Sequence, residues 1–328
     1  MIRNQWYAIL DCKEVRKKNK PISVLRLGEK LVLWRDNKNQ IHCLFDKCSH
    51  RGAALSLGKI INDNIQCPFH GLEYDSTGKC KLIPANSIKA VVPDRFQVKN
   101  YIVREKHGFI WIWWGEPREE YPPIPWFDDL SDDFHYYTIR DQWKTHYSRV
   151  IENQLDVVHL PYVHHNTIGR GGRTVVEGPI VEIADDLETV WFMNRKENGK
   201  LPKKITDLEK PPYPPMLYFK FPHIWQNKLS KDGRIFVAFT PVDEANTLVY
   251  ARFYQRFLKF PILKQIASFF GKLGSIIILH QDRRVVETQS PKSSSWKSDE
   301  NLIQGDRPIV YYRRKRHELK NTKNKSEI

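Results

Sequence analysis

The chain has 328 residues, of which 41% are hydrophobic and 12% are aromatic. This length allows two domains that each bury a core, and this composition excludes general disorder. The net charge of +15 suits nucleic-acid binding, but no nucleic-acid motif accompanies the basic residues. We expect the charge to attract an acidic partner protein instead, because opposite fields speed encounter.

The chain start and the longest apolar region show no sign of export or membrane insertion. Met1–Tyr7 lacks the apolar core and the cleavage site of a signal peptide. The region Phe257–Leu279 is interrupted by Lys259, Lys264 and Lys272, so it is a poor membrane span. The five cysteines are an odd number, which argues against a disulfide framework. We therefore expect a cytoplasmic protein with no membrane span.

The first third of the chain combines short strands with two Cys/His pairs. The expected strands are the β-rich runs at residues 22–26, 30–35 and 41–45. Cys48-Ser-His50 follows the last of them, and Cys67-Pro-Phe-His70 comes sixteen residues after that pair. Two thiolates and two imidazoles suit tetrahedral zinc. They also suit a Rieske [2Fe–2S] cluster, in which the cysteines bind one iron and the histidines the other.

The residues around these pairs favour the cluster. Residues 51–58 and 71–78 supply glycines that let backbone N–H groups approach bridging sulfides, whereas a zinc ion has no sulfides. The segment Cys48–Gly78 resembles a Rieske site. Neither loop has a further cysteine, which is similar to the low-potential centres of ferredoxins and oxygenases, within a range of about −150 to +300 mV. The remaining cysteines are expected to be small buried hydrophobes: Cys12, Cys43 and Cys80.

A strand and a linker end this first domain. Gly108–Trp114 alternates as an apolar strand, Gly115-Glu-Pro117 ends it, and the Pro-rich residues 121–125 form a linker. We expect the domain boundary near residue 120. Residues 1–120 then form an all-β domain, and residues 121–328 form a second domain with a basic C-terminal tail.

A polar run after the linker offers metal ligands. On a predicted helix, Asn153, Asp156 and His159 are spaced three apart and share one face. Pro161 is expected to end that helix, so that His164 turns back towards His159. Two neutral imidazoles suit iron or zinc. Asp156 is then a hydrogen-bonding partner of a ligand histidine or a conduit for protons and electrons.

The rest of the second domain is expected to pair antiparallel strands with a long helix, giving an α+β fold. We predict a polar loop over residues 195–215 and a helix over residues 260–289 whose lysines face water in the concave side of the sheet. The tail from Arg313 to Arg316, with Lys320, Lys323 and Lys325, is expected to be a solvated, frayed end. Strands are predicted at residues 174–183, 189–194, 216–221, 234–240 and 247–255.

A mononuclear iron needs a third ligand, and two histidines with one carboxylate leave positions open for oxygen and substrate. Asp282 and Glu287 are both candidates. With the first domain, this pattern resembles the terminal oxygenase component of the Rieske non-haem iron oxygenases. The resemblance implies iron on His159, His164 and Asp282, because the family's aspartate precedes a similar Val-Val-Glu run. His165 leaves the second ligand ambiguous.

The resemblance implies further features of the chain. The length and the C-terminal sequence are similar to the homotrimeric branch of vanillate demethylase-like and pheophorbide oxygenase-like proteins, with a helix-grip (START-like) catalytic domain. In that branch each cluster serves the iron of the neighbouring subunit, and an aspartate, here Asp156, bridges a cluster histidine, here His70, and the ligand His159. Glu287 is expected to pair with Arg283 or Arg284.

The implied function is oxygenation. The cluster would be held by Cys48, His50, Cys67 and His70, and a separate ferredoxin or flavin reductase would supply electrons from NAD(P)H, because no Gly-rich dinucleotide loop occurs. O2 would then be used to hydroxylate or oxidatively demethylate a small organic substrate, by mono- or dioxygenation. Aromatic pocket residues expected on the strands are Phe219, Phe221, Trp225, Phe236 and Phe239.

Two other functions stay open on the sequence. One is a Rieske electron-transfer protein whose second half is a non-catalytic binding domain. The other is a zinc-dependent hydrolase. An electron carrier has no need for two histidines and a carboxylate in its second half. A zinc enzyme would contain zinc and no acid-labile sulfide.

Overall fold

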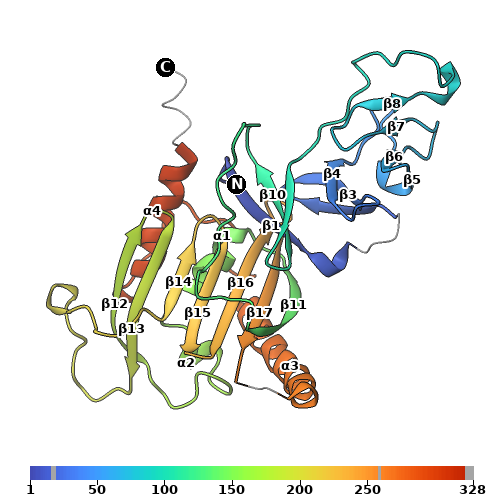
Figure 1. Ribbon diagram of the computed structural model, residues 1–328. Helices are drawn as coiled ribbons and strands as arrows, with labels where there is room; N and C mark the ends of the chain where they lie inside the picture. The colour runs from blue at the N-terminus through green and yellow to red at the C-terminus, as the bar shows by residue number, and fades with distance from the viewer. Residues whose placement is uncertain (16–19, 258–259, 322–328) are drawn as a thin grey trace. The chain divides into compact units, whose positions relative to one another are not determined.

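The computed structural model describes residues 1–15, 20–257 and 260–321, and only the backbone of residues 261–270. The chain forms two compact units (Figure 1). The first is Arg3–Ile124, and the second comprises Met1–Ile2 and the chain from Pro125 onward. The predicted α+β class is confirmed, because the first unit is built of strands and the second combines a large sheet with helices.

The first unit contains three small antiparallel sheets. One has the order β1-β10-β9, the next β2-β3-β4, and the last β5-β6-β7-β8. The strands are β1 (Gln5–Asp11), β2 (Ile22–Arg26), β3 (Glu29–Arg35), β4 (Ile41–Phe45), β5 (Lys59–Ile61), β6 (Asn64–Gln66), β7 (Glu73–Tyr74), β8 (Cys80–Leu82), β9 (Val103–Lys106) and β10 (Phe109–Trp114). The four strands predicted here are confirmed, with bounds shifted by at most one residue.

Two groups of buried apolar residues stabilise this unit. The first is centred on β10, in which every residue is buried and Trp113 packs edge-on against Trp6 of β1. The second is a hydrophobic cluster that includes the two ligand cysteines of the Cys/His loops, together with the fully buried Trp34 and Tyr74. The loops that carry the two Cys/His pairs therefore rest on a packed core rather than on flexible chain.

The second unit is built on one seven-stranded antiparallel sheet with the order β11-β17-β16-β15-β14-β13-β12. Its strands are β11 (His135–Trp143), β12 (Val175–Ala184), β13 (Leu187–Arg195), β14 (Leu217–Lys220), β15 (Ile224–Ser230), β16 (Gly233–Pro241) and β17 (Thr247–Gln255). Its helices are α1 (Tyr147–Leu155), α2 (Leu160–Val163), α3 (Pro261–Val286) and α4 (Arg307–Asn321). The five strands and the long helix predicted here are confirmed.

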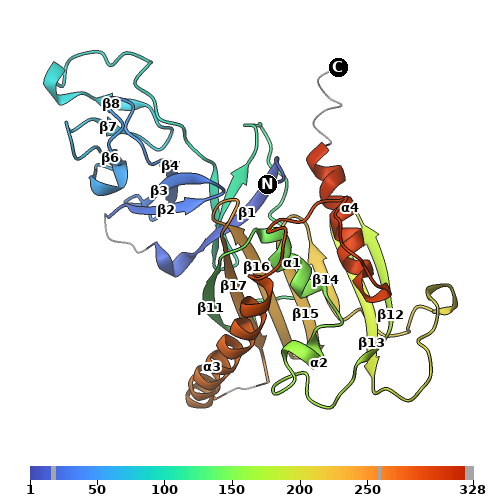
Figure 2. The same cartoon turned by 180° about the vertical axis from the view of Figure 1, so that it is seen from behind.

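All the larger helices pack on one face of this sheet, as Figures 1 and 2 show. Tyr147 and Ile151 of α1, Leu279 of α3 and Tyr312 of α4 share one hydrophobic core with strand residues such as Val237. The opposite face is covered by the segment before β11, through ring contacts such as that of Trp126 with Phe236. The sheet therefore has a helix-covered face, on which the candidate site lies.

The prediction of one helix through Asp156 and His159 is wrong. The first helix, α1, ends at Leu155, and Asp156 is its C-terminal cap with an extended backbone. The Asp156 carboxylate accepts hydrogen bonds from the backbone N–H groups of Val158, at 2.6 Å, and His159, at 3.2 Å. This local bonding competes with helix, as short acidic side chains often do.

The role predicted for Pro161 is also wrong. Pro161 lies in the first turn of the short helix α2 and so begins a helix rather than ending one. A missing N–H costs nothing at this position, because the first N–H groups of a helix have no intrahelical partner. The helix α2 then separates His159, at its start, from His164, at its end.

The prediction of a frayed basic tail is wrong for the residues that the structure describes. Arg313 and Arg316 lie in α4 and are 4% and 6% exposed. Lys323 and Lys325 lie outside the described residues, as do Lys259 and the side chain of Lys264 in the predicted lysine face of α3. In the described part of α3, the side chain of Lys272 is exposed as expected. No helix of the described chain is long and apolar enough to cross a bilayer.

Candidate metal centres and an adjoining cavity

The two Cys/His loops of the first unit repeat one backbone arrangement. Gly52 N–H donates to the carbonyl of Cys48 at 2.9 Å, and Gly71 N–H donates to that of Cys67 at 3.1 Å. Both glycines have a positive φ, +77° and +74°. A side chain is strained in this region, so glycine is required at the tip of each loop. The matched turns hold the two pairs in similar local geometry.

Sulfur and nitrogen ligands are divided between the interior and the surface. The Cys48 and Cys67 side chains are buried, each 2% exposed, whereas His50 and His70 are exposed with ring centroids 4.8 Å apart. Tyr74 OH lies 3.1 Å from Cys48 Sγ. Burial raises the pKa of the Cys67 thiol, and the neighbouring Cys48 adds to the effect. Buried sulfurs on one side and exposed imidazoles on the other match the ligand division of a Rieske cluster.

The second unit brings together His159, His164 and Asp282. Their ligand atoms lie within 4.8 Å of one another, and they are the only group of this kind within the described residues. Asp282 Oδ1 lies 3.0 Å from His164 Nε2 and 3.5 Å from His159 Nε2. This oxygen is buried without a hydrogen bond of acceptable geometry to any described residue. Two imidazoles and such a carboxylate fit a divalent iron that keeps open coordination positions.

Gln281, which is not among the predicted site residues, orients one of these histidines. Gln281 Oε1 lies 2.8 Å from His164 Nδ1, and it also accepts from the Thr167 hydroxyl at 2.9 Å. An acceptor on Nδ1 keeps the proton there and leaves Nε2 free to bind a metal. Burial acts to lower the pKa of His164, but Asp282 and Gln281 outweigh it and hold that pKa above its ordinary value.

Asp156 lies beside the triad and is not part of it. Its Oδ1 is 3.8 Å from His159 Nδ1, longer than a hydrogen bond, and 26% of its side chain is exposed. Burial acts to raise the pKa of Asp156, but His159 and the backbone donors outweigh it, so that pKa is below its ordinary value. The carboxylate is therefore a fixed negative charge within reach of both His159 and solvent.

The two ambiguous ligand candidates lie outside the triad. His165 is exposed, and its Nδ1 lies 3.0 Å from the carbonyl of Tyr162. Glu287 Oε1 accepts from the backbone N–H of Lys144 at 2.7 Å. The predicted ion pair of Glu287 with Arg283 or Arg284 is wrong, because Glu287 has no ion pair among the described residues. Arg283 pairs instead with Asp141 at 2.6 Å.

A cavity of about 150 Å³ opens beside the triad. His159, His164 and Asp282 are among its lining residues, and many of the others are apolar residues of the sheet. Of the five aromatic residues predicted for the pocket, Trp225 lines it. The prediction is wrong for the other four, which pack in the core or on the opposite face of the sheet: Phe219, Phe221, Phe236 and Phe239.

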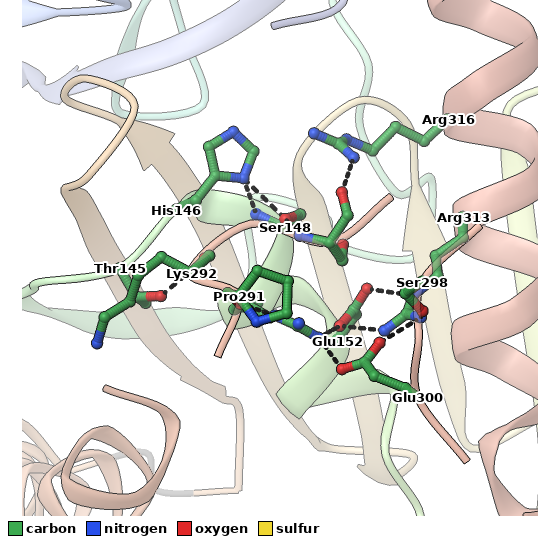
Figure 3. Close-up of polar contacts among 12 residues, drawn as sticks. Thr145, His146, Ser148, Glu152, Pro291, Lys292, Ser298, Glu300, Arg313 and Arg316 are labelled. Carbon is green, nitrogen blue, oxygen red and sulfur yellow. Dashed lines mark hydrogen bonds and ion pairs between the residues drawn. The ribbon is translucent and has the colours of Figure 1, made fainter. Parts of the chain in front are cut away.

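Buried ionic contacts anchor α1, the helix that leads into the triad (Figure 3). Arg313 of α4 holds the carboxylate of Glu152 through two hydrogen bonds, at 2.7 and 3.0 Å. Arg149 donates to the same carboxylate at 3.0 Å, and Glu300 pairs with Arg149 at 2.8 Å and with Arg313 at 2.7 Å. The backbone carbonyl of Glu152 accepts from Asp156 N–H at 2.9 Å. The position of Asp156 therefore depends on α4.

Two family models match the chain. The Rieske [2Fe-2S] domain matches residues 5–101, and the vanillate O-demethylase oxygenase C-terminal domain matches residues 143–322. The second match alone spans more than half of the chain.

Curated relatives and solved structures agree with these matches. The putative toluene-4-sulfonate monooxygenase system iron-sulfur subunit TsaM2 of Comamonas testosteroni is 30% identical over 59% of this chain and 56% of its own. The chloroplastic protein TIC 55 of Pisum sativum is 25% identical over 87% and 51%. The chain thus spans about half the length of the curated relatives it matches.

Two solved structures share the fold over nearly the whole chain. Pseudomonas putida CBB5 NdmA has a TM-score of 0.78 at 22% identity, over 98% of this chain and 92% of its own. Dicamba monooxygenase bound to dicamba has a TM-score of 0.73 at 20% identity, over 99% of each chain. With both domain matches and the ligand geometry, these findings place the chain in the family of Rieske oxygenases that carry a vanillate O-demethylase-type C-terminal domain.

Proposed function

We propose that this chain is the terminal oxygenase component of a Rieske-type system. Residues 1–120 form the Rieske domain and residues 121–328 the catalytic domain. A [2Fe–2S] cluster is held by Cys48, His50, Cys67 and His70, and a ferrous ion is held by His159, His164 and Asp282. When bound, these groups supply electron storage and the activation of O2.

The protein's own side chains prepare the iron site. Gln281 fixes the His164 tautomer that presents Nε2 to the metal. Asp156 provides a path for protons and electrons beside His159, and its one-quarter exposure lets a histidine of another surface reach it. The cavity walls are mostly apolar, which disfavours water beside these ligands.

One observation carries this proposal. Two histidines that flank α2 and an aspartate of α3 line a mostly apolar cavity. A simple electron carrier needs neither a second metal site nor a substrate cavity, so the geometry favours the oxygenase over the carrier with a binding domain.

The partners follow from the same family. We propose that a separate ferredoxin or flavin reductase delivers electrons from NAD(P)H, and that it presents an acidic face to this chain, whose net charge is +15. We also propose a homotrimer in which the cluster of one subunit serves the iron of the next, with Asp156 as the link between His70 and His159. Mass measurement in solution tests the trimer.

The substrate proposed is an apolar, ring-bearing molecule that undergoes hydroxylation or oxidative demethylation. The cavity walls support an apolar body. Relatives support a ring, since they are named for toluene-4-sulfonate and dicamba.

We further propose a cytoplasmic location. None of the five cysteines forms a disulfide, as in a reducing compartment, and cell fractionation tests the location.

The experiment that tests this function is substrate-dependent O2 uptake by protein reconstituted anaerobically with iron and sulfide, with a suitable reductase. The panel comprises simple aromatics, methyl ethers, quaternary amines and polycyclic compounds. We expect at least one ring compound to stimulate uptake and to be recovered with oxygen inserted or a methyl group removed. Reduction and reoxidation of the cluster with no ligand stimulating O2 uptake would instead indicate the electron carrier.

A further inference from the structure

The register of the sheet sets one amide in the wall of the cavity. A row of directly paired residues crosses five strands on the helix-covered face. Its members are Tyr137, Phe253, Ile235, Asn227 and Leu217. All five line the cavity, and Asn227 is the single amide among them. An apolar residue at this position would continue the pattern of its neighbours Ile235 and Leu217.

Two polar side-chain atoms of β15 in this wall lack hydrogen-bond partners within the described chain. Asn227 Oδ1 and Trp225 Nε1 are both buried, and neither has a hydrogen bond to any described residue. The two residues are two apart on one strand, so their side chains emerge on the same face. A buried acceptor and a buried donor on two residues that line one cavity are each unfavourable unless a ligand or water satisfies them.

Two other polar residues of the sheet in this wall, Tyr137 and Arg252, have partners. The hydroxyl of Tyr137 lies 3.2 Å from Ser275 Oγ. Arg252 directs its guanidinium to Thr138 at 3.1 Å and to the Tyr254 hydroxyl at 3.2 Å, on the other face of the sheet. Apart from the proposed metal, the described lining thus offers no free cationic side chain to a substrate anion.

We propose that Asn227, with Trp225 beside it, determines substrate specificity. It selects an uncharged single-ring molecule whose polar group both donates and accepts a hydrogen bond, as a hydroxyl does. The donor of that group meets Asn227 Oδ1, and its acceptor meets Trp225 Nε1–H. An apolar cavity of about 150 Å³ holds a benzene-sized ring. This inference rests on the proposed function, because it concerns the cavity of the iron site.

Phenol and toluene test this directly, since they share size and differ in the hydroxyl. Binding is measured by calorimetry on the anaerobic, metal-loaded protein, so that no turnover occurs. In Asn227→Leu, we expect the ratio of phenol affinity to toluene affinity to fall about tenfold, as loss of one buried hydrogen bond predicts. Iron content should stay unchanged, and the melting temperature should not fall, because the substitution removes an unpaired buried acceptor. The exposed amide variant Asn198→Leu is the matched control and should keep the wild-type ratio.

An unchanged ratio in Asn227→Leu would overturn the inference, and so would an equal loss of affinity for both ligands or no binding of either by the wild type. If Asn227→Leu does not fold, Trp225→Phe makes the same test with anisole against toluene, because anisole only accepts. Failure of the proposed function has a different signature: the phenol preference would persist while no ligand stimulates O2 uptake.

Discussion

At the scale of single residues, the account depends on which side chains bind iron in the second unit. His159→Ala removes one of the three converging ligands. We expect iron content to fall from about three to about two per chain, because the cluster keeps its two irons. The cluster's visible spectrum should survive. Iron analysis with absorption spectroscopy measures both.

The neighbouring histidine provides the control for that experiment. His165 is exposed and lies outside the triad, so His165→Ala should keep the full iron content. Loss of iron from the His165 variant alone, or loss of cluster and iron together in His159→Ala, would contradict the assignment of ligands.

Asp156 is expected to take part in proton and electron transfer next to the metal without coordinating it. Asp156→Asn keeps the shape of the side chain and the backbone hydrogen bonds at the end of α1, but removes the negative charge beside His159. We expect full loading of both centres and a fall in turnover of at least roughly 100-fold, as for loss of a positioned proton-transfer group. Single-turnover kinetics measure it. Normal turnover in a fully loaded variant would exclude the role.

The candidate ligand sets could be proposed from the sequence, because metal chemistry restricts residue type and spacing, and the structure brings His159, His164 and Asp282 together. Cys48-Ser-His50 and His159 with His164 are visible as local patterns, and Asp282 needed the family resemblance. Gln281 could not be predicted, since its contact with His164 joins segments more than a hundred residues apart. The orphan atoms of Asn227 and Trp225 likewise become visible only when the sheet register is known.

At the scale of secondary-structure elements, α4 holds α1 through buried charges. Glu152→Ala leaves Arg313 and Arg149 with one carboxylate partner fewer in a buried site. We expect it to lower the free energy of unfolding by about 3–5 kcal/mol, as removal of one member of a buried ion pair does. Urea denaturation of the apoprotein measures the change.

The same helix supplies the matched control. Arg314 faces solvent and lies 4.0 Å from Glu318, with half of its side chain exposed. Arg314→Ala should cost no more than about 1 kcal/mol, because exposed ion pairs contribute little. Equal effects of the Glu152 and Arg314 variants would show that the buried network does not stabilise the unit.

The strand β13 carries a buried acid, Glu188, whose carboxylate has no hydrogen bond to any described residue. Burial raises the pKa of Glu188 well above its ordinary value. The folded state therefore binds a proton more tightly than the unfolded state. Stability is highest below the pKa of an unfolded glutamate and falls as pH rises towards the raised pKa, by about 1.4 kcal/mol per pH unit.

Glu188→Gln removes this titration. We expect the variant to be more stable than the wild type at pH 7 and above, with the difference shrinking as the pH approaches 4. Thermal unfolding between pH 4 and pH 8 measures it. A constant difference across this range, or a variant that is less stable at pH 8, would contradict the burial of an unpaired carboxyl.

Helices and strands could be predicted where apolar residues recur at a regular spacing. They could not be predicted where buried polar residues are stabilised by partners far away in the sequence. The strand Ile224–Ser230 was missed because Gln226 breaks its apolar pattern, yet Gln226 is buried and donates to Asp129. The helix α4 was read as a charged tail because its arginines bond with Glu152 and Tyr147, which are distant in sequence. The break at Asp156 reflects local side-chain bonding that periodicity does not report.

At the scale of the whole molecule, the chain joins an all-β unit to a unit with a seven-stranded sheet, and each carries one convergent set of ligands. The α+β class could be predicted from the strand and helix patterns, and the two candidate metal sites from ligand patterns on either side of a Pro-rich linker. The cavity could not, because its lining residues come from six strands and three helices that are far apart in the sequence.

The central claim is that one chain holds two different iron centres. Quantitative analysis of iron, zinc and acid-labile sulfide on anaerobically reconstituted protein tests it most directly. We expect about three irons and about two sulfides per chain, with the third iron lost in Asp282→Ala. Two irons in the wild type, or zinc without sulfide, would contradict the account.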